Sequence, residues 1–115
     1  MELLTDNFRE KLLANGRHNA GREETQDFLP VVKLFCPWGA ATWLLTELDP
    51  ESPEIAFGLC DLGMGSPEIG SVSLSELAEI TGPGGLRIER DLHFRPVKTL
   101  QAYADEARRL GGIEA

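Results

Sequence analysis

Four short apolar segments follow one another in residues 30–74, and turns rich in proline and glycine separate them. Each connection has only a few residues, too few for the crossover that joins parallel strands. Apolar segments of this length between such turns are typical of β-hairpins. The pattern therefore predicts consecutive antiparallel strands near residues 31–36, 41–48, 54–61 and 69–73.

Helix-start signals precede three further segments. Thr5, Ser73 and Thr99 each stand where a side-chain oxygen can accept a hydrogen bond from the first helical turn. Ser73 and Glu76 also have the spacing of a capping box. The predicted helices cover residues 5–13, 74–80 and 99–110, while the polar residues 16–27 are expected to form a mobile loop.

A fifth strand is predicted over residues 86–94, and Arg90 interrupts its pattern. A guanidinium on an apolar face needs an acceptor, because a buried unpaired charge is costly. We expect Arg90 to meet a carboxylate, Glu47 first and Asp61 second. Two alternatives stay open, a ligand-binding arginine on the sheet face and a strand bulge that turns Arg90 outward. The other residues on this face are Leu86, Ile88, Leu92 and Phe94.

The opposite face of the same strand carries charges of alternating sign. This alternation is typical of a strand face in solvent, and a single histidine among carboxylates is not a metal motif. The side chains would form a binding site only if they lined a concave pocket. They are Arg87, Glu89, Asp91, His93 and Arg95.

The length and the order of elements define the fold class. A chain of 115 residues with 42% hydrophobic residues is expected to form one domain, 1–115, with its own core. A run of strands with helices at both ends and before the last strand indicates an α+β fold. We expect an antiparallel sheet of four to five strands, with short helices on one face or end.

All of the net charge lies in one internal block. Residues 34–86 contain eight acidic residues and no Lys, Arg or His, so the block carries the whole formal charge of −8. The other eleven acidic residues are balanced by the eleven basic ones. One-sided charge selects which partners are attracted. The predicted acidic surface consists of Glu47, Asp49, Glu51, Glu54, Asp61, Glu68, Glu76 and Glu79.

Several classes of function are disfavoured by the composition. A pI near 4.7 argues against binding to nucleic-acid phosphates or anionic membranes, both of which need clustered cations. No apolar run of membrane-spanning length and no signal-peptide pattern occur. Cys36 and Cys60 form no CxxC pair, which indicates reduced thiols in the cytoplasm. No spacing typical of a catalytic or metal site occurs, so no cofactor is predicted and an enzyme is disfavoured.

Several segments resemble a family of small bacterial proteins catalogued as a domain of unknown function. They are MELLTDNFREKL, VVKLFCPWGAATWLLTE, FGLCDLGMGSPEIGSVSL, and SLSEL followed by GPGGLRIERDLHF. The resemblance covers about residues 2–103, while 102–115 is less family-like. It implies a free-standing cytosolic protein, often carried with plasmid or conjugative-element genes, without a known activity or cofactor. The recurrent motif residues would be Lys33, Phe35, Trp43, Glu47, Gly58, Glu68, Gly70, Leu74, Leu77, Glu89, Arg90, Asp91 and Phe94.

These observations favour a non-enzymatic interaction protein that binds the basic surface of another protein through acidic residues. Its sharpest form is an anti-restriction protein whose carboxylates mimic DNA phosphates. The alternative is a small-ligand binder or enzyme centred on Glu47, Glu89, Arg90 and Asp91. A weaker alternative is a nucleic-acid binder that uses the interspersed basic residues. The candidate cluster is Lys33, Trp43, Glu47, Glu89, Arg90 and Asp91.

Overall fold

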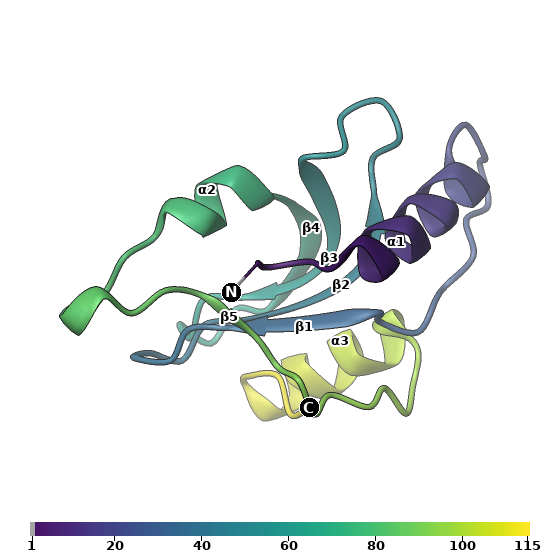
Figure 1. The fold of residues 1–115 in the computed structure, drawn as a ribbon. Helices are drawn as coiled ribbons and strands as arrows, with labels where there is room; N and C mark the ends of the chain where they lie inside the picture. Colours follow the sequence, from purple (N-terminus) through teal and green to yellow (C-terminus); the bar gives the residue numbers. More distant parts are fainter. Residues whose placement is uncertain (1) are drawn as a thin grey trace.

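The computed structural model describes residues 2–115 and shows an α+β fold, as predicted (Figure 1). Five strands form one antiparallel sheet in the order β4-β3-β2-β1-β5. The strands are β1 (Val32–Phe35), β2 (Thr42–Leu48), β3 (Ile55–Asp61), β4 (Glu68–Ser73) and β5 (Glu89–Arg90). The helices are α1 (Asp6–Asn19), α2 (Leu74–Glu79), the short 3₁₀ turn η1 (Pro83–Gly85) and α3 (Leu100–Leu110).

Helices cover both faces of the sheet, so the expectation of helices on one face or end was wrong. In Figure 1, α1 and α2 lie above the sheet and α3 lies below it. The cause is visible in β2, where Leu45 belongs to the core under α1 and Leu44 to the core under α3. Both side chains are fully buried. A strand that is apolar on both faces needs a cover on each.

Helix α1 is longer than predicted and includes residues 16–19, which we had assigned to the mobile loop. The predicted cap is present, since the Thr5 hydroxyl accepts a hydrogen bond from the Phe8 N–H at 3.2 Å. The helix continues through Gly16, where an added Cβ would lie 1.9 Å from the Leu48 carbonyl oxygen. Only glycine fits at position 16, because any side chain there would collide with β2. The packing of α1 against β2 therefore explains why a glycine lies within the helix.

Strand β5 has only two residues, so the prediction of a strand over 86–94 was wrong. Gly84 and Gly85 have positive φ and turn the chain before it. After it, the Asp91 carboxylate accepts a hydrogen bond from the His93 N–H at 2.8 Å, which forms a local turn. Leu86 and Leu92 are consequently 42% and 60% exposed, instead of packing on a sheet face.

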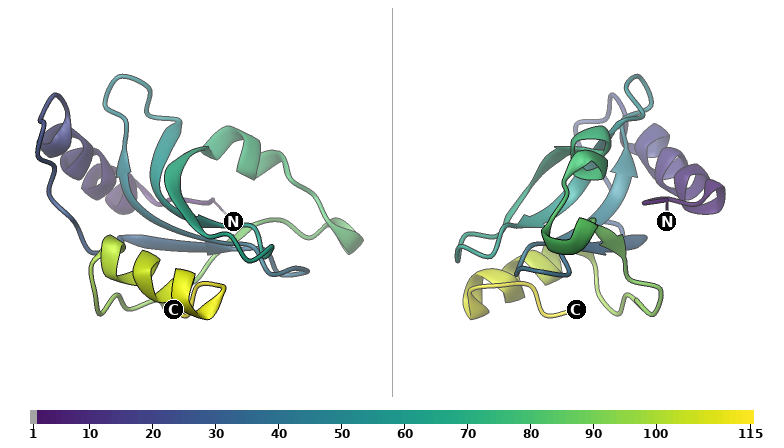
Figure 2. Two further views of the ribbon diagram at one scale, coloured as in Figure 1. Left: turned by 180° about the vertical axis from the view of Figure 1, so that it is seen from behind. Right: turned by 60° about the vertical axis from the view of Figure 1, so that its left-hand side comes forward.

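The segment from α2 through η1 extends past the end of the sheet, as the left view of Figure 2 shows. The capping of α2 is confirmed, because the Ser73 hydroxyl accepts a hydrogen bond from the Glu76 N–H. Further along, an added Cβ on Gly82 would lie 2.5 Å from the Trp38 ring. The extended segment is thus held against the turn between β1 and β2.

Candidate functional site

The pairing of β1 with β5 decides which charged side chains share a face. Leu34 pairs with Arg90 and Phe35 pairs with Glu89. Side chains alternate between the faces along a strand, and paired residues point the same way. Arg90 therefore lies on the α1 side with Leu34, whereas Glu89 lies on the α3 side.

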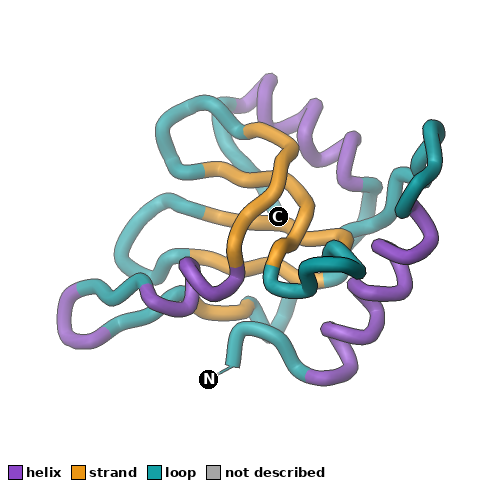
Figure 3. Tube along the Cα trace, turned by 90° about the horizontal axis from the view of Figure 1, so that it is seen from above, coloured by secondary structure: helices purple, strands orange, loops and turns teal. Residues whose placement is uncertain are grey.

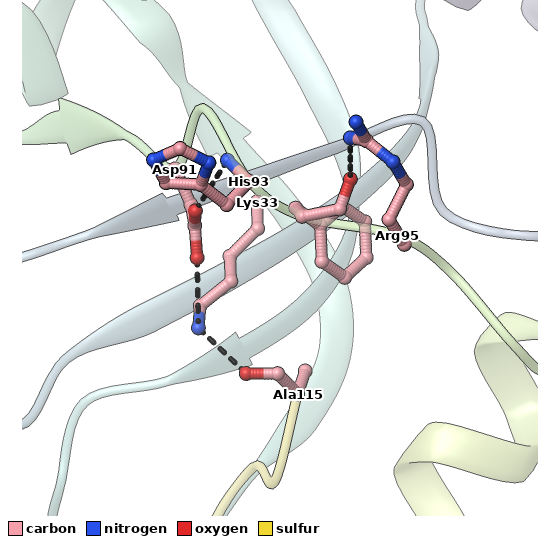
Figure 4. Close-up of polar contacts among 6 residues, drawn as sticks. Lys33, Asp91, His93, Arg95 and Ala115 are labelled. Atoms are coloured by element: carbon pink, nitrogen blue, oxygen red, sulfur yellow. Dashed lines mark hydrogen bonds and ion pairs between the residues drawn. The ribbon is translucent and has the colours of Figure 1, made fainter.

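Lys33 and Asp91 form an ion pair across this strand pair (Figure 4). The Lys33 ammonium lies 3.4 Å from the Asp91 carboxylate and donates a hydrogen bond to the Ala115 backbone oxygen at 2.7 Å. The pKa of Asp91 is lowered, chiefly by the hydrogen bond from the His93 backbone and also by Lys33. The carboxylate is thus held in its charged form.

Charged residues of the β5 segment line an open, concave hollow of about 500 Å³. Of the five residues predicted on the solvent face, Arg87, His93 and Arg95 are exposed. Lys33, Glu89, Asp91 and His93 are part of its wall, and Thr42 of β2 is another part. We call this the β1–β5 hollow. It brings together Lys33, Glu89, Arg90 and Asp91 of the predicted cluster.

Arg90 does not form the predicted ion pair with Glu47 or Asp61. Its Nη1 donates hydrogen bonds to the backbone oxygens of Glu2 at 2.7 Å and Leu3 at 2.9 Å. Because β5 is the edge strand, its neighbour on the α1 side is the N-terminal segment and not β2. Carbonyl oxygens therefore replace the carboxylate that the sequence pattern suggested.

Glu47 lies apart from the β1–β5 hollow. A bulge in β2 between Leu45 and Glu47 shifts the register of the strand. The Glu47 carboxylate accepts a hydrogen bond from the Asn19 side-chain amide at 2.8 Å, at the end of α1. Burial raises the pKa of Glu47, and the bond from Asn19 partly opposes that effect.

Trp43 and Asp61 are buried, and both are only 4% exposed. Trp43 is part of the core on the α1 side. The Asp61 carboxylate accepts hydrogen bonds from the backbone N–H groups of Gly63 at 2.8 Å and Ile113 at 3.0 Å. Asp61 therefore holds the chain after α3 in place, and its assignment to an acidic surface was wrong.

A second hollow, of about 540 Å³, lies between the N-terminal segment, the start of β3 and α2. Figure 3 shows the N-terminal segment and α2 at the same end of the sheet. Four carboxylates line the hollow, those of Glu2, Asp6, Glu54 and Glu79, and Arg9 is the one cationic side chain that lines it among residues 2–115. We call it the acidic groove. Within residues 2–115 none of the four carboxylates forms an ion pair.

The sequence indicated only half of the acidic groove. Glu54 and Glu79 belong to the predicted acidic surface, but Glu2 and Asp6 lie outside the block that drew attention to it. The usable signal was Asp6, because an acidic residue in a first helical turn interacts favourably with the helix dipole. The sequence could assign Asp6 to α1, but the fact that it lines the same hollow as α2 depends on the tertiary fold.

The structure defines an α+β protein with a five-stranded antiparallel sheet between helices, an ion-paired hollow at one sheet edge and an acidic groove beside α2. The chain belongs to the family described as "Protein of unknown function (DUF2958)", whose model matches residues 3–114. The resemblance to a domain of unknown function is thereby confirmed. The match also includes the last helix, which we had considered less family-like. No curated protein and no solved structure matches the chain.

Two further observations concern membranes and metals. No helix within residues 2–115 is both long and apolar enough to cross a bilayer. Across the same residues, no three His, Cys, Asp or Glu side chains are arranged to hold a metal ion.

Cys36 and Cys60 are half-buried free thiols, and burial raises the pKa of Cys60.

Proposed function

We propose that this chain is a non-enzymatic interaction protein that binds the basic surface of a partner protein through the acidic groove. The observation that carries this proposal is that Glu2, Asp6, Glu54 and Glu79 line one hollow with only Arg9 as a cation and form no ion pair among residues 2–115. Carboxylates that share one surface give it a negative potential, which attracts cationic groups. A partner that supplies lysine or arginine side chains would complement that potential.

The walls of the groove also favour a partner with apolar residues between its basic ones. Leu3, which is half-buried, and Ala78, which is exposed, line the hollow and give it accessible apolar surface. Charge complementarity speeds association and selects partners, whereas apolar contact adds affinity. We therefore expect the partner to present an amphipathic basic segment.

The family resemblance suggests a sharper form of the proposal. The resemblance implies a bacterial cytosolic protein whose gene is often carried with plasmid or conjugative-element genes. In that setting the partner would be a protein whose basic surface binds DNA. An anti-restriction role of this kind requires carboxylates that occupy the phosphate sites of such a surface. Competition between this chain and DNA for the same partner would distinguish it from an ordinary interaction protein.

Affinity capture from the native host lysate tests the proposal when two variants that lose the same amount of negative charge are compared. The variant Glu54→Gln/Glu79→Gln removes two groove carboxylates, and Glu23→Gln/Glu24→Gln removes two exposed carboxylates that do not line the groove. We expect the control to retain the proteins captured by the unchanged chain and the groove variant to lose them. Equal retention by both variants, or equal loss, would contradict a role of the groove.

A second candidate function is small-ligand binding at the β1–β5 hollow. It is favoured because Lys33, Glu89, Asp91 and His93 line a concave space. Glu47 is not among the residues that line that space, so this candidate no longer includes it. A screen of polar compounds by amide NMR would test it, with shifts expected at Gly39 and Thr42, which line the hollow.

A further inference from the structure

A smaller hollow, of about 190 Å³, lies next to Arg90 and has a basic lining. Lys33, Arg90 and Arg95 contribute three cations to it, and Asp91 contributes the only carboxylate. The rings of Phe8 and Phe94 are parts of its apolar wall. We call it the Arg90 pocket. The walls of the β1–β5 hollow are formally balanced and those of the acidic groove are negative, so the Arg90 pocket has the opposite polarity to the groove.

The single carboxylate of the pocket is already engaged. Asp91 accepts the His93 backbone N–H and pairs with Lys33, and no ion pair within residues 2–115 involves Arg90 or Arg95. The Arg95 guanidinium donates a hydrogen bond only to the backbone oxygen of its neighbour Phe94, at 3.1 Å. Arg90 and Arg95 are therefore without an ion-pair partner among the described residues.

Arg90 also has a donor without an acceptor. Both of its hydrogen bonds start at Nη1, whereas Nε is buried and has no partner within residues 2–115. A buried N–H group without an acceptor is rare in folded proteins, and a bound ion is one way in which such a group becomes satisfied. The Nε side of a guanidinium is part of the planar fork that binds the two oxygens of a carboxylate or phosphate.

We propose that the Arg90 pocket binds a small oxyanion, a phosphate or carboxylate group, with Arg90 as the principal ligand and Arg95 as the second cation. Leu92 is also part of the pocket wall and is 60% exposed, so one side of the pocket is formed by a side chain that is not held in the core. The inference does not depend on the acidic groove. The Arg90 pocket shares Lys33, Arg90, Asp91 and Leu92 with the β1–β5 hollow. It differs from the second candidate function in its use of Arg95, Phe8 and Phe94, which do not line that hollow.

The test is an NMR titration of the whole chain with inorganic phosphate, and separately with acetate, at constant ionic strength set with chloride. We expect saturable shifts at the amides of Phe8, Arg90 and Arg95. Comparison of phosphate with acetate shows which oxyanion the pocket prefers. Shifts confined to Gly39 and Thr42 would place the anion in the β1–β5 hollow, which would overturn this inference and leave the second candidate function intact.

Variants separate a built site from general counter-ion binding. Arg95→Ala removes an exposed side chain and should weaken the affinity for the preferred anion at least about tenfold, the effect of losing one charged contact. Arg22→Ala removes the same charge from an exposed loop and should leave the affinity unchanged. Arg90→Lys, which lacks the fork, should abolish saturable binding. Equal weakening by Arg95→Ala and Arg22→Ala, or shifts that never saturate, would overturn the proposal.

Discussion

The Arg90 guanidinium lies 5.5 Å from the centre of the Phe8 ring, which ties the edge strand β5 to helix α1. A guanidinium over an aromatic face is attracted by the ring electrons. The same side chain donates two hydrogen bonds to the N-terminal segment. Arg90 thus connects three parts of the chain without an ion pair.

Replacement of Arg90 by alanine should lower the free energy of unfolding by about 1–3 kcal/mol, since charged hydrogen bonds and the Phe8 contact are lost. This is less than the loss expected from breaking a buried ion pair, which is about 3–5 kcal/mol. Urea unfolding of the wild type and the variant measures the difference. A double-mutant cycle with Phe8→Leu should give a coupling of about 0.5–1 kcal/mol. Zero coupling would show that the Phe8 contact has no energetic role.

Asp91 should make stability depend on pH at the acid end. Its pKa is lower in the folded chain, so its contribution is fully present above the unfolded pKa, about 3.9, and is lost as pH falls through the folded value. Asp91→Ala should therefore destabilise the protein at neutral pH and have little effect in strong acid. Asp91→Asn should be milder, because asparagine can still accept the His93 N–H. Thermal unfolding across this pH range provides the measurement.

Glu47 should make the stability of the protein depend on pH in the opposite direction to Asp91. Because burial raises its pKa, the folded chain binds the proton more tightly, and stability falls as pH rises from the unfolded towards the folded pKa. Glu47→Gln should keep an acceptor for the Asn19 amide and remove the half-buried charge. At neutral pH we expect this variant to be at least as stable as the wild type. In acid, where Glu47 is protonated, we expect the variant to be no more stable than the wild type. A loss of stability at neutral pH would show that the carboxylate charge is needed.

Asp61 should hold the chain that follows α3. Asp61→Ala removes the acceptor of the Ile113 and Gly63 N–H groups, and we expect a loss of about 2–4 kcal/mol in unfolding free energy. Amide hydrogen exchange gives the local readout. The Ile113 amide should exchange faster in the variant, while amides of β2 should keep their relative protection. Unchanged exchange at Ile113 would contradict the assigned role.

Strands β1 to β4 were predictable because local signals agreed with one another. Apolar segments, short turns and the Ser73 cap all indicate the same boundaries, and the structure confirms them. Predictions failed where tertiary contacts decide. Gly16 suggested the end of a helix, and only its close approach to Leu48 in the fold explains why the helix continues. The alternation around Arg90 suggested a long strand, but the turns on both sides of β5 shorten it.

The candidate site was predictable only in part for a related reason. Neighbours along a strand pair, such as Lys33 and Asp91, are brought together by the register of β1 and β5. The distance between Glu47 and Arg90 in the fold depends on a bulge and on which strand lies at the edge. Residues from separate elements, such as Asp6 and Glu79, converge only in the tertiary structure.

The most direct test of the acidic groove is carbodiimide cross-linking of the chain to its captured partner, followed by mass spectrometry of the linked peptides. This reagent joins a carboxylate to a lysine amine only when the two are in contact. We predict cross-links from Glu2, Asp6, Glu54 or Glu79 to partner lysines, and their loss when salt screens the charges. Cross-links that start mainly from Glu23, Glu24 or Glu114, or evenly from all exposed carboxylates, would contradict the account.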